Sequence, residues 1–234
     1  MSLDDRLYYR TPAETVAPSE LMRSVYNWMG LGLAVTALTS LYTASSPAML
    51  QLIFGNKLVF FGLVLGELGL VVALSGAINR ITSSSAVLMF FVYSALNGVT
   101  LSLIFLMYTS ASIASTFFIT AGVFGVMSVY GYTTGKDLTS WGSFLFMGLV
   151  GVVLASVVNI FFNSESIYWA VTYCGVIVFV GLTAYDTQKI KAMAYSGAFD
   201  DEGGRKLAVI GALQLYLDFV NLFLLLLRLF GRRR

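Results

Sequence analysis

The sequence contains no histidine, one cysteine and three prolines among its 234 residues. Without histidine, Ser-His-Asp catalysis, Cys-His catalysis and histidine-ligated metal sites are excluded. Cys174 has no second cysteine with which to form an intrachain disulfide, and we interpret it as a small apolar packing residue.

Charged residues are also scarce, at 11% of the chain, whereas 58% of it is hydrophobic. A soluble domain is about half apolar and a quarter charged. The formal net charge of +2 gives no reason to expect nucleic-acid binding, and the residues predict no cofactor. The composition instead predicts a protein whose main surrounding is a lipid bilayer.

Seven apolar stretches are long enough to cross a bilayer, which takes about 20 residues each. They predict an all-α integral membrane protein with seven transmembrane helices, at about 22–43, 56–79, 85–108, 112–134, 141–162, 167–188 and 207–230. Residues 21–234 would form one transmembrane domain behind a polar, cytoplasmic N-terminal tail at residues 1–20, which lacks the apolar run of a signal peptide. Small residues four apart, such as Gly30 with Ala34 and Gly151 with Ala155, predict close helix packing.

The positions of lysine and arginine predict the orientation of the chain. With seven crossings and a cytoplasmic N-terminus, nine of the 14 basic residues lie inside and five outside, as the positive-inside rule favours. A re-entrant last segment would bring the arginines at 228 and 232–234 inside, so charge favours re-entry. The length of 207–230, about 36 Å as a helix, favours a crossing, which is the expectation we adopt.

Three carboxylates fall within the apolar segments: Glu67, Asp186 and Asp218. A carboxylate at bilayer depth costs roughly 2.5–3.5 kcal/mol on insertion scales, so such residues face the bundle interior or water and mark ion or proton pathways. Glu67 could line an ion path or could pair with a hydroxyl group in the packed bundle, and the sequence leaves both open.

Polar residues form a stripe along the last segment. Steps of three and four residues join six positions and place them on one face of a helix, and four of the six are polar: Gly211, Gln214, Asp218, Asn221, Leu225 and Arg228. Because the other faces are almost entirely apolar, this helix is predicted to lie inside the bundle, with its stripe toward a polar cavity or polar partners. Gln214 and Asn221 could line an ion path, although hydrogen bonds between helices are the simpler explanation for two amides.

Asp186, near the cytoplasmic end of 167–188, is the predicted partner of Asp218. Two carboxyl groups within hydrogen-bonding distance cannot both ionise cheaply, so the pair shares a proton and forms a pH-sensitive latch. The same oxygens could hold calcium transiently. The predicted depths in the membrane oppose this pairing. Asp186 would lie about 3 Å from the cytoplasmic end of its segment, and Asp218 about 16 Å from the cytoplasmic end of its own.

Arg80 ends the second predicted segment. It could form a salt bridge with Asp186 or could only anchor the end of its helix.

Two runs carry a family resemblance: VIVFVGLTAYDTQKIK at 176–191 and GALQLYLDFVNLFLLLLRLFG at 211–231. They resemble the end of the Bax inhibitor-1 family, the transmembrane Bax-inhibitor-motif proteins, and the bacterial branch is nearest. The resemblance implies six helices wrapped around the C-terminal one and a place in the bacterial inner membrane. It also implies a pH-sensitive calcium leak with Asp186 and Asp218 as the sensor pair. A basic residue that ends the second helix engages the sixth-helix aspartate in some members, and Arg80 is its nearest match here.

Two other functions stay open beside the calcium leak. One is a non-transporting regulator of a membrane protease or stress partner, because bacterial relatives are linked to membrane proteolysis. The other is an intramembrane aspartyl protease, which would use Asp186 and Asp218 as acid and base. The glycines that such proteases carry before the second aspartate are missing, and Tyr216 adds bulk where substrate should approach. We therefore expect that the protein is not an enzyme.

Overall fold

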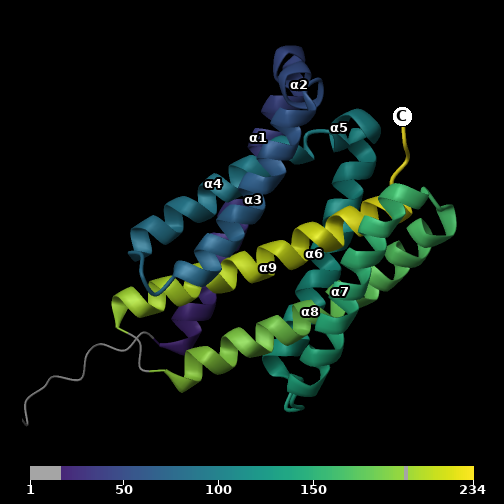
Figure 1. Cartoon of the computed structure of the whole chain (residues 1–234). Coiled ribbons are helices and arrows are strands. Elements are labelled where there is room, and N and C mark those ends of the chain that lie inside the picture. The colour runs from purple at the N-terminus through teal and green to yellow at the C-terminus, as the bar shows by residue number, and fades with distance from the viewer. Residues whose placement is uncertain (1–16, 198–199) are drawn as a thin grey trace, which may run out of the picture.

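The computed structural model describes residues 17–197 and 200–234, and all regular structure within them is helical. Figure 1 shows the helices side by side, with α9 among them. The nine helices are α1 Pro18–Ser45, α2 Pro47–Phe54, α3 Lys57–Ala77, α4 Ser83–Leu101, α5 Ile104–Met107, α6 Ser110–Thr133, α7 Thr139–Phe162, α8 Glu165–Ser196 and α9 Asp201–Phe230.

Five of the long helices in the described chain begin after a capping side chain. Asn56, Thr82, Thr109, Ser164 and Asp200 each precede a long helix and accept a hydrogen bond from a backbone N–H of its first turn. Such side chains satisfy N–H groups that have no partner within the helix.

The predicted number of seven helices is wrong, because the chain also forms the short helices α2 and α5 in its connections. Six helices of the described chain are long and apolar enough to cross a membrane, and α1 is not one of them. At 28 residues α1 has the length, but hydroxyl side chains interrupt its apolar run. Three of these are buried, namely Thr36, Ser40 and Thr43, so α1 turns a polar face toward the other helices.

The long helices lie over the predicted segments, with different ends. α1 begins at Pro18, inside the predicted tail of residues 1–20, whose first 16 residues lie outside the described chain. The largest difference concerns α8, which continues to Ser196 instead of ending near residue 188. α9 begins at Asp201, six residues before the predicted start, because Asp200 caps it there.

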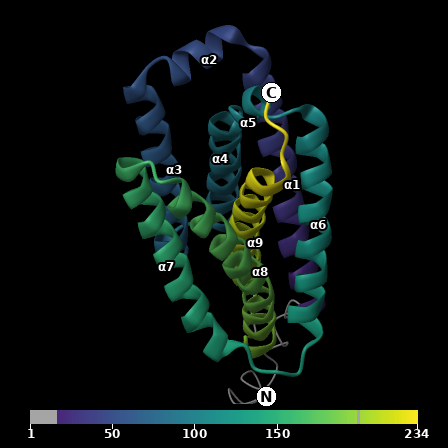
Figure 2. The same cartoon turned by 90° about the vertical axis from the view of Figure 1, so that its right-hand side faces the viewer.

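α9 is the most buried of the six membrane-length helices: 72% of its most apolar window is buried, against 6% in α3 and in α7. Its main contacts are with α1, α4, α6 and α8, whereas α3 packs chiefly on α4 and α7 on α8. The described chain thus does not show six helices in direct contact with the C-terminal helix. Four flank it, and α3 and α7 lie outside these four (Figure 2).

α1 and α9 run in the same direction, and their first turns line a common small pocket. We call this the lower end, as oriented in Figure 2; the upper end holds α2, α5 and residues 231–234. α9 runs without interruption from Asp201 to Phe230, about 45 Å of helix. The structure therefore has no re-entrant turn in the last segment.

Close helix packing depends on other glycines than those predicted. A Cβ atom added to Gly30 or Gly151 would meet nothing within 4 Å. At Gly98 it would collide with Thr39 of α1, and at Gly131 with the carbonyl oxygen of Ala184 in α8. Gly98 therefore lets α4 approach α1 closely, and Gly131 lets α6 approach α8 closely. All four of these helices also contact α9.

Candidate functional site

The site begins with Asp186 of α8 and Asp218 of α9, which the structure brings together. Both are buried, with 9% and 5% of their surface exposed, and their side chains lie within hydrogen-bonding reach of each other. A hydrogen bond between two carboxyl groups requires that one of them carries a proton.

The extra lengths of α8 and α9 move both aspartates deeper, and the difference in depth falls only from about 13 Å to about 11 Å, because Asp218 lies 17 residues, about 26 Å, after the start of α9. Asp186 lies ten residues before the end of α8, which corresponds to about 15 Å of helix rather than the predicted 3 Å. α8 and α9 pack closely along their length, so both aspartates lie well inside the bundle.

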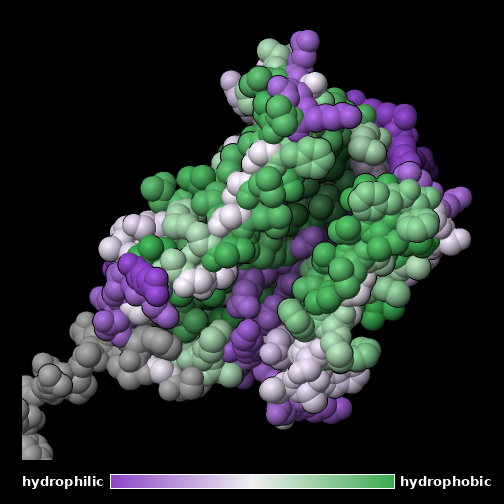
Figure 3. All heavy atoms as spheres, viewed as in Figure 1, coloured by the Kyte–Doolittle hydropathy of each residue, from purple (hydrophilic) through white to green (hydrophobic). Residues whose placement is uncertain are grey.

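A cavity of about 710 Å³ opens beside the two aspartates, between α7, α8 and α9. Its polar lining comes from Asp186 and Lys189 of α8 and from Gln214, Asp218 and Asn221 of α9. Three members of the polar stripe of α9 therefore face one cavity. Figure 3 shows hydrophilic surface in a cleft between two hydrophobic parts of the molecule, where α9 runs in Figure 1.

The polar groups of this site are only partly satisfied by the protein. Oδ2 of Asp218 is buried and receives no hydrogen bond from an N–H or hydroxyl group of the described chain, so a protonated Asp186 is the donor within its reach. The amide of Asn221, another residue of the lining, donates to the carbonyl oxygen of Leu217 at 2.8 Å. Lys189, one turn beyond Asp186, is the other charged side chain of the lining. The site can therefore accept protons or cations on oxygens that the fold leaves without donors.

Glu67 is not brought to this site. Its carboxylate accepts a hydrogen bond from the hydroxyl of Thr100 at 3.0 Å and one from the amide of Asn97 at 3.5 Å, both on α4. Glu67 does not line the cavity beside Asp186 and Asp218. Of the two roles that the sequence left open, pairing within the bundle is the one that its contacts fit.

Arg80 is exposed in the turn after α3. The one salt bridge among the described residues joins Lys206 to Glu202, so Arg80 does not pair with Asp186 in this structure. Glu202 instead holds the turn near Arg80, because its carboxylate accepts hydrogen bonds from the backbone N–H and the hydroxyl of Ser83.

A second polar cluster, which was not predicted from the sequence, lies on another face of α9. The hydroxyl of Tyr216 lies 2.6 Å from the hydroxyl of Thr36 in α1 and donates to the amide oxygen of Asn97 in α4 at 3.2 Å. Through Asn97 the cluster continues to Glu67. Tyr216 therefore points toward α1 and α4 and does not line the cavity beside Asp218, so its position does not fit the expectation that its bulk lies where substrate should approach. A tyrosine amid leucines was the available signal, since a buried phenol needs a hydrogen-bond partner.

No group of three His, Cys, Asp or Glu side chains in the part of the chain described lies close enough to hold a metal ion. The cavity offers two carboxyl groups with the oxygens of Gln214 and Asn221. Transient calcium binding at Asp186 and Asp218 stays a prediction.

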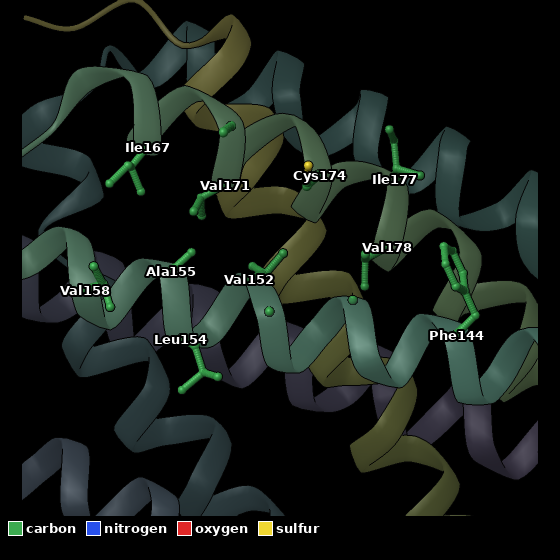
Figure 4. A pocket seen from close by; sticks show the side chains of 13 residues that line it. Phe144, Val152, Leu154, Ala155, Val158, Ile167, Val171, Cys174, Ile177 and Val178 are labelled. Atoms are coloured by element: carbon green, nitrogen blue, oxygen red, sulfur yellow. The ribbon is translucent and has the colours of Figure 1, made fainter.

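A second large cavity differs completely in chemistry. It is a groove of about 670 Å³ between α7 and α8, lined by aliphatic side chains such as Val152, Val171 and Val178 (Figure 4). The lone cysteine, Cys174, is exposed there. Apart from the Cys174 thiol this lining presents no acidic or basic side chain, so the groove lacks the carboxyl groups of the aspartate cavity.

The chain was compared with known proteins. Residues 18–234 match the model of the family described as inhibitor of apoptosis-promoting Bax1. The inner membrane protein YbhL of Escherichia coli K12 is 54% identical over 214 residues, which cover 91% of this chain and 92% of that protein. An uncharacterized protein of Borreliella burgdorferi is 47% identical, over 94% of this chain and 95% of its own length. An uncharacterized membrane protein of Streptococcus pyogenes is 36% identical, over 93% and 94%.

Proposed function

The chain belongs to the Bax inhibitor-1 family, and from this premise we propose that it is a pH-sensitive calcium leak channel of the bacterial inner membrane. The observation that carries the proposal is the contact between two buried aspartates, Asp186 and Asp218, beside a polar cavity in a membrane-length bundle. A relative named as an inner membrane protein supports the location.

In the proposed mechanism the two aspartates hold α8 against α9 by sharing one proton. With the shared proton, the carboxyl groups attract each other and the helices stay together. Without it, two buried negative charges repel each other or recruit a calcium ion, which prefers oxygen ligands. With two protons the pair is neutral and its hydrogen bond is weaker. Lys189 is the other charged group on the cavity lining.

We propose further that the lower end lies in the cytoplasm and that calcium passes along the stripe of α9, at Gln214 and Asn221. Seven described lysines and arginines belong to the lower end and five to the upper end, the order that the positive-inside rule favours.

The test is calcium leak in liposomes that contain only the purified protein and lipid. We expect a leak that changes between about pH 6 and 8, by up to about tenfold per pH unit for one linked proton. Asp186→Asn and Asp218→Asn should each flatten this pH dependence. The double variant should be no flatter than either single one, because the two residues act as a unit. Asp137→Asn is the matched control, because Asp137 is an exposed carboxylate in the α6–α7 connection.

Three outcomes would count against the proposal. If the single variants keep the wild-type pH profile, the aspartate pair is not the gate. If the wild-type protein passes no calcium, the chain is better explained as a non-transporting regulator of a membrane protease or stress partner. Cleavage of a transmembrane peptide that depends on Asp218 would make it an intramembrane aspartyl protease.

A further inference from the structure

The upper end of the molecule contains a second polar pocket, of about 480 Å³, which the calcium leak does not use. It lies between the α7–α8 turn, the end of α9 and the residues that follow α9. Its polar and aromatic lining includes Asn159, Asn163, Tyr168, Trp169, Arg228 and Arg233.

The chain beyond α9 is held in place by pairing with residues 107–112. Thr109 N–H donates to the carbonyl oxygen of Arg232 at 3.1 Å, and Arg234 N–H donates to that of Met107 at 3.0 Å. Arg232 N–H donates to the hydroxyl of Ser112 at 3.0 Å, and Tyr108 and Arg233 form an isolated antiparallel bridge.

This pairing decides which arginine reaches the pocket. Side chains alternate from one side to the other along an extended chain. Arg233 therefore points away from the side on which Arg232 and Arg234 lie, and it alone of the three lines the pocket. The backbone pairing with residues 107–112 therefore determines the side on which the Arg233 side chain lies.

The two arginines of the pocket have aromatic partners but no carboxylate. Arg233 donates to the hydroxyl of Tyr168 at 3.3 Å, and it lies opposite Tyr108 in the antiparallel bridge. The guanidinium of Arg228 lies 5.5 Å from the centre of the Tyr168 ring. Neither arginine forms a salt bridge with a described residue. Glu165 is the one acidic residue on the lining and is exposed, so the pocket keeps an excess of positive charge.

These features suit one class of ligand. Two guanidinium groups with free N–H donors match the oxygens of a phosphate group. Tyr168, Trp169 and Tyr173 lie together, with the rings of Trp169 and Tyr173 stacked at 5.9 Å, and such residues gather at the headgroup level of a membrane. The apolar groove of Figure 4 reaches the same α7–α8 turn, at Val158 and Ile167, where an acyl chain could follow a bound headgroup. We propose that this pocket binds the phosphate of an anionic phospholipid.

Trp169 provides a reporter for the test, once the other two tryptophans are removed as Trp28→Phe and Trp141→Phe. In nanodiscs, lipids with acyl chains brominated near the headgroup quench the fluorescence of a nearby tryptophan. We expect brominated phosphatidylglycerol to quench Trp169 more strongly than brominated phosphatidylcholine at equal mole fraction. Arg233→Gln and Arg228→Gln should each reduce this preference about fivefold.

Arg232→Gln is the matched control, because it removes the same charge from the same short segment on the other side. If it lowers the preference as much as Arg233→Gln does, general attraction to the tail explains the binding and the proposed site is wrong. Tyr168→Phe should also weaken the preference, since it releases Arg233 without a change of charge. Equal quenching by the two lipids would overturn the proposal. Loss of the preference in millimolar inorganic phosphate would assign the pocket to a soluble phosphate instead.

Discussion

Tyr216 and Asp218 lie two residues apart on α9, yet their surroundings have little in common. Because successive helix positions differ by about 100°, the two side chains point in opposite directions. Tyr216 is fully buried against α1 and α4, where its hydroxyl has two partners, Thr36 and Asn97. Asp218 faces α8 and a cavity, and one of its oxygens receives no hydrogen bond from an N–H or hydroxyl group of the described chain.

This difference separates two uses of a polar group inside a membrane bundle. A satisfied group such as the Tyr216 hydroxyl joins helices in one arrangement, since breaking it would leave buried donors and acceptors unpaired. Two adjacent carboxyl groups attract each other when they share a proton or bind a cation, and they repel each other when both are ionised. The contact between their helices therefore depends on protonation or ion binding. The Tyr216 face of α9 is therefore suited to holding the bundle together, and the Asp218 face to changing it.

The largest expected effect follows from removing the Tyr216 side chain. Tyr216→Ala should lower the free energy of unfolding by about 3–5 kcal/mol, the usual cost of deleting a buried aromatic side chain. The ring also packs edge-on against Phe90 and Tyr93, at 5.8 and 5.7 Å between centres. Tyr216→Phe keeps these ring contacts and should cost only about 1 kcal/mol. Thermal unfolding in detergent measures both, and equal losses would show that the hydroxyl group, and not the packing, dominates.

The next effect has the opposite sign. Asp218→Asn should raise the free energy of unfolding by about 1–2 kcal/mol at pH 8, because it replaces one of two adjacent carboxyl groups with a neutral amide that can donate to Asp186. The same thermal unfolding assay checks this change. A loss of stability as large as that of Tyr216→Phe would remove the contrast between the two faces, since Asp218 would then also hold the helices together.

The sequence could predict the Asp218 face because its signal is local. A carboxylate in an apolar run, with Gln214 and Asn221 at helical spacing, indicates a polar face whatever surrounds it. The contact with Asp186 was predicted from the order of the helices, although its depth was not, because the cap at Asp200 and the extra length of α8 are tertiary features.

The Tyr216 face could not be predicted in the same way. Its partners Thr36 and Asn97 lie 180 and 119 residues away in the chain, and hydroxyl groups on membrane helices can also bond to their own backbone. The same limit applies to the glycines, because Gly98 and Gly30 look alike in sequence and only Gly98 meets another helix closely. The two extra helices, α2 and α5, are too short for a pattern of apolar residues to reveal.

A smaller effect is expected at Thr36, the partner of Tyr216 on α1. Thr36→Val keeps the shape of the side chain and removes its hydroxyl, so it should cost about 1 kcal/mol. Combined with Tyr216→Phe, it should cost less than the sum of the two single effects, because both substitutions remove the Thr36–Tyr216 hydrogen bond, while Thr36→Val also removes the bond to the carbonyl oxygen of Ser94. Thr39→Val is the control, because the Thr39 hydroxyl bonds only to its own helix. Simple additivity in the double variant would mean that the two hydroxyls act independently.

The smallest effect is expected for Glu67, which tests whether the Tyr216 cluster takes any part in conduction. Glu67 has donors for both of its oxygens, Thr100 and Asn97, and it does not line the cavity of the aspartate pair. Glu67→Gln keeps an acceptor for Thr100, so stability should change by less than about 1 kcal/mol. Calcium leak in liposomes and its pH midpoint should both stay at the wild-type values. A lower leak with an unchanged midpoint would place Glu67 on the ion path, and a shifted midpoint would make it part of the sensor. Either result would mean that the two faces of α9 act together, through Asn97 and Tyr216, and not separately.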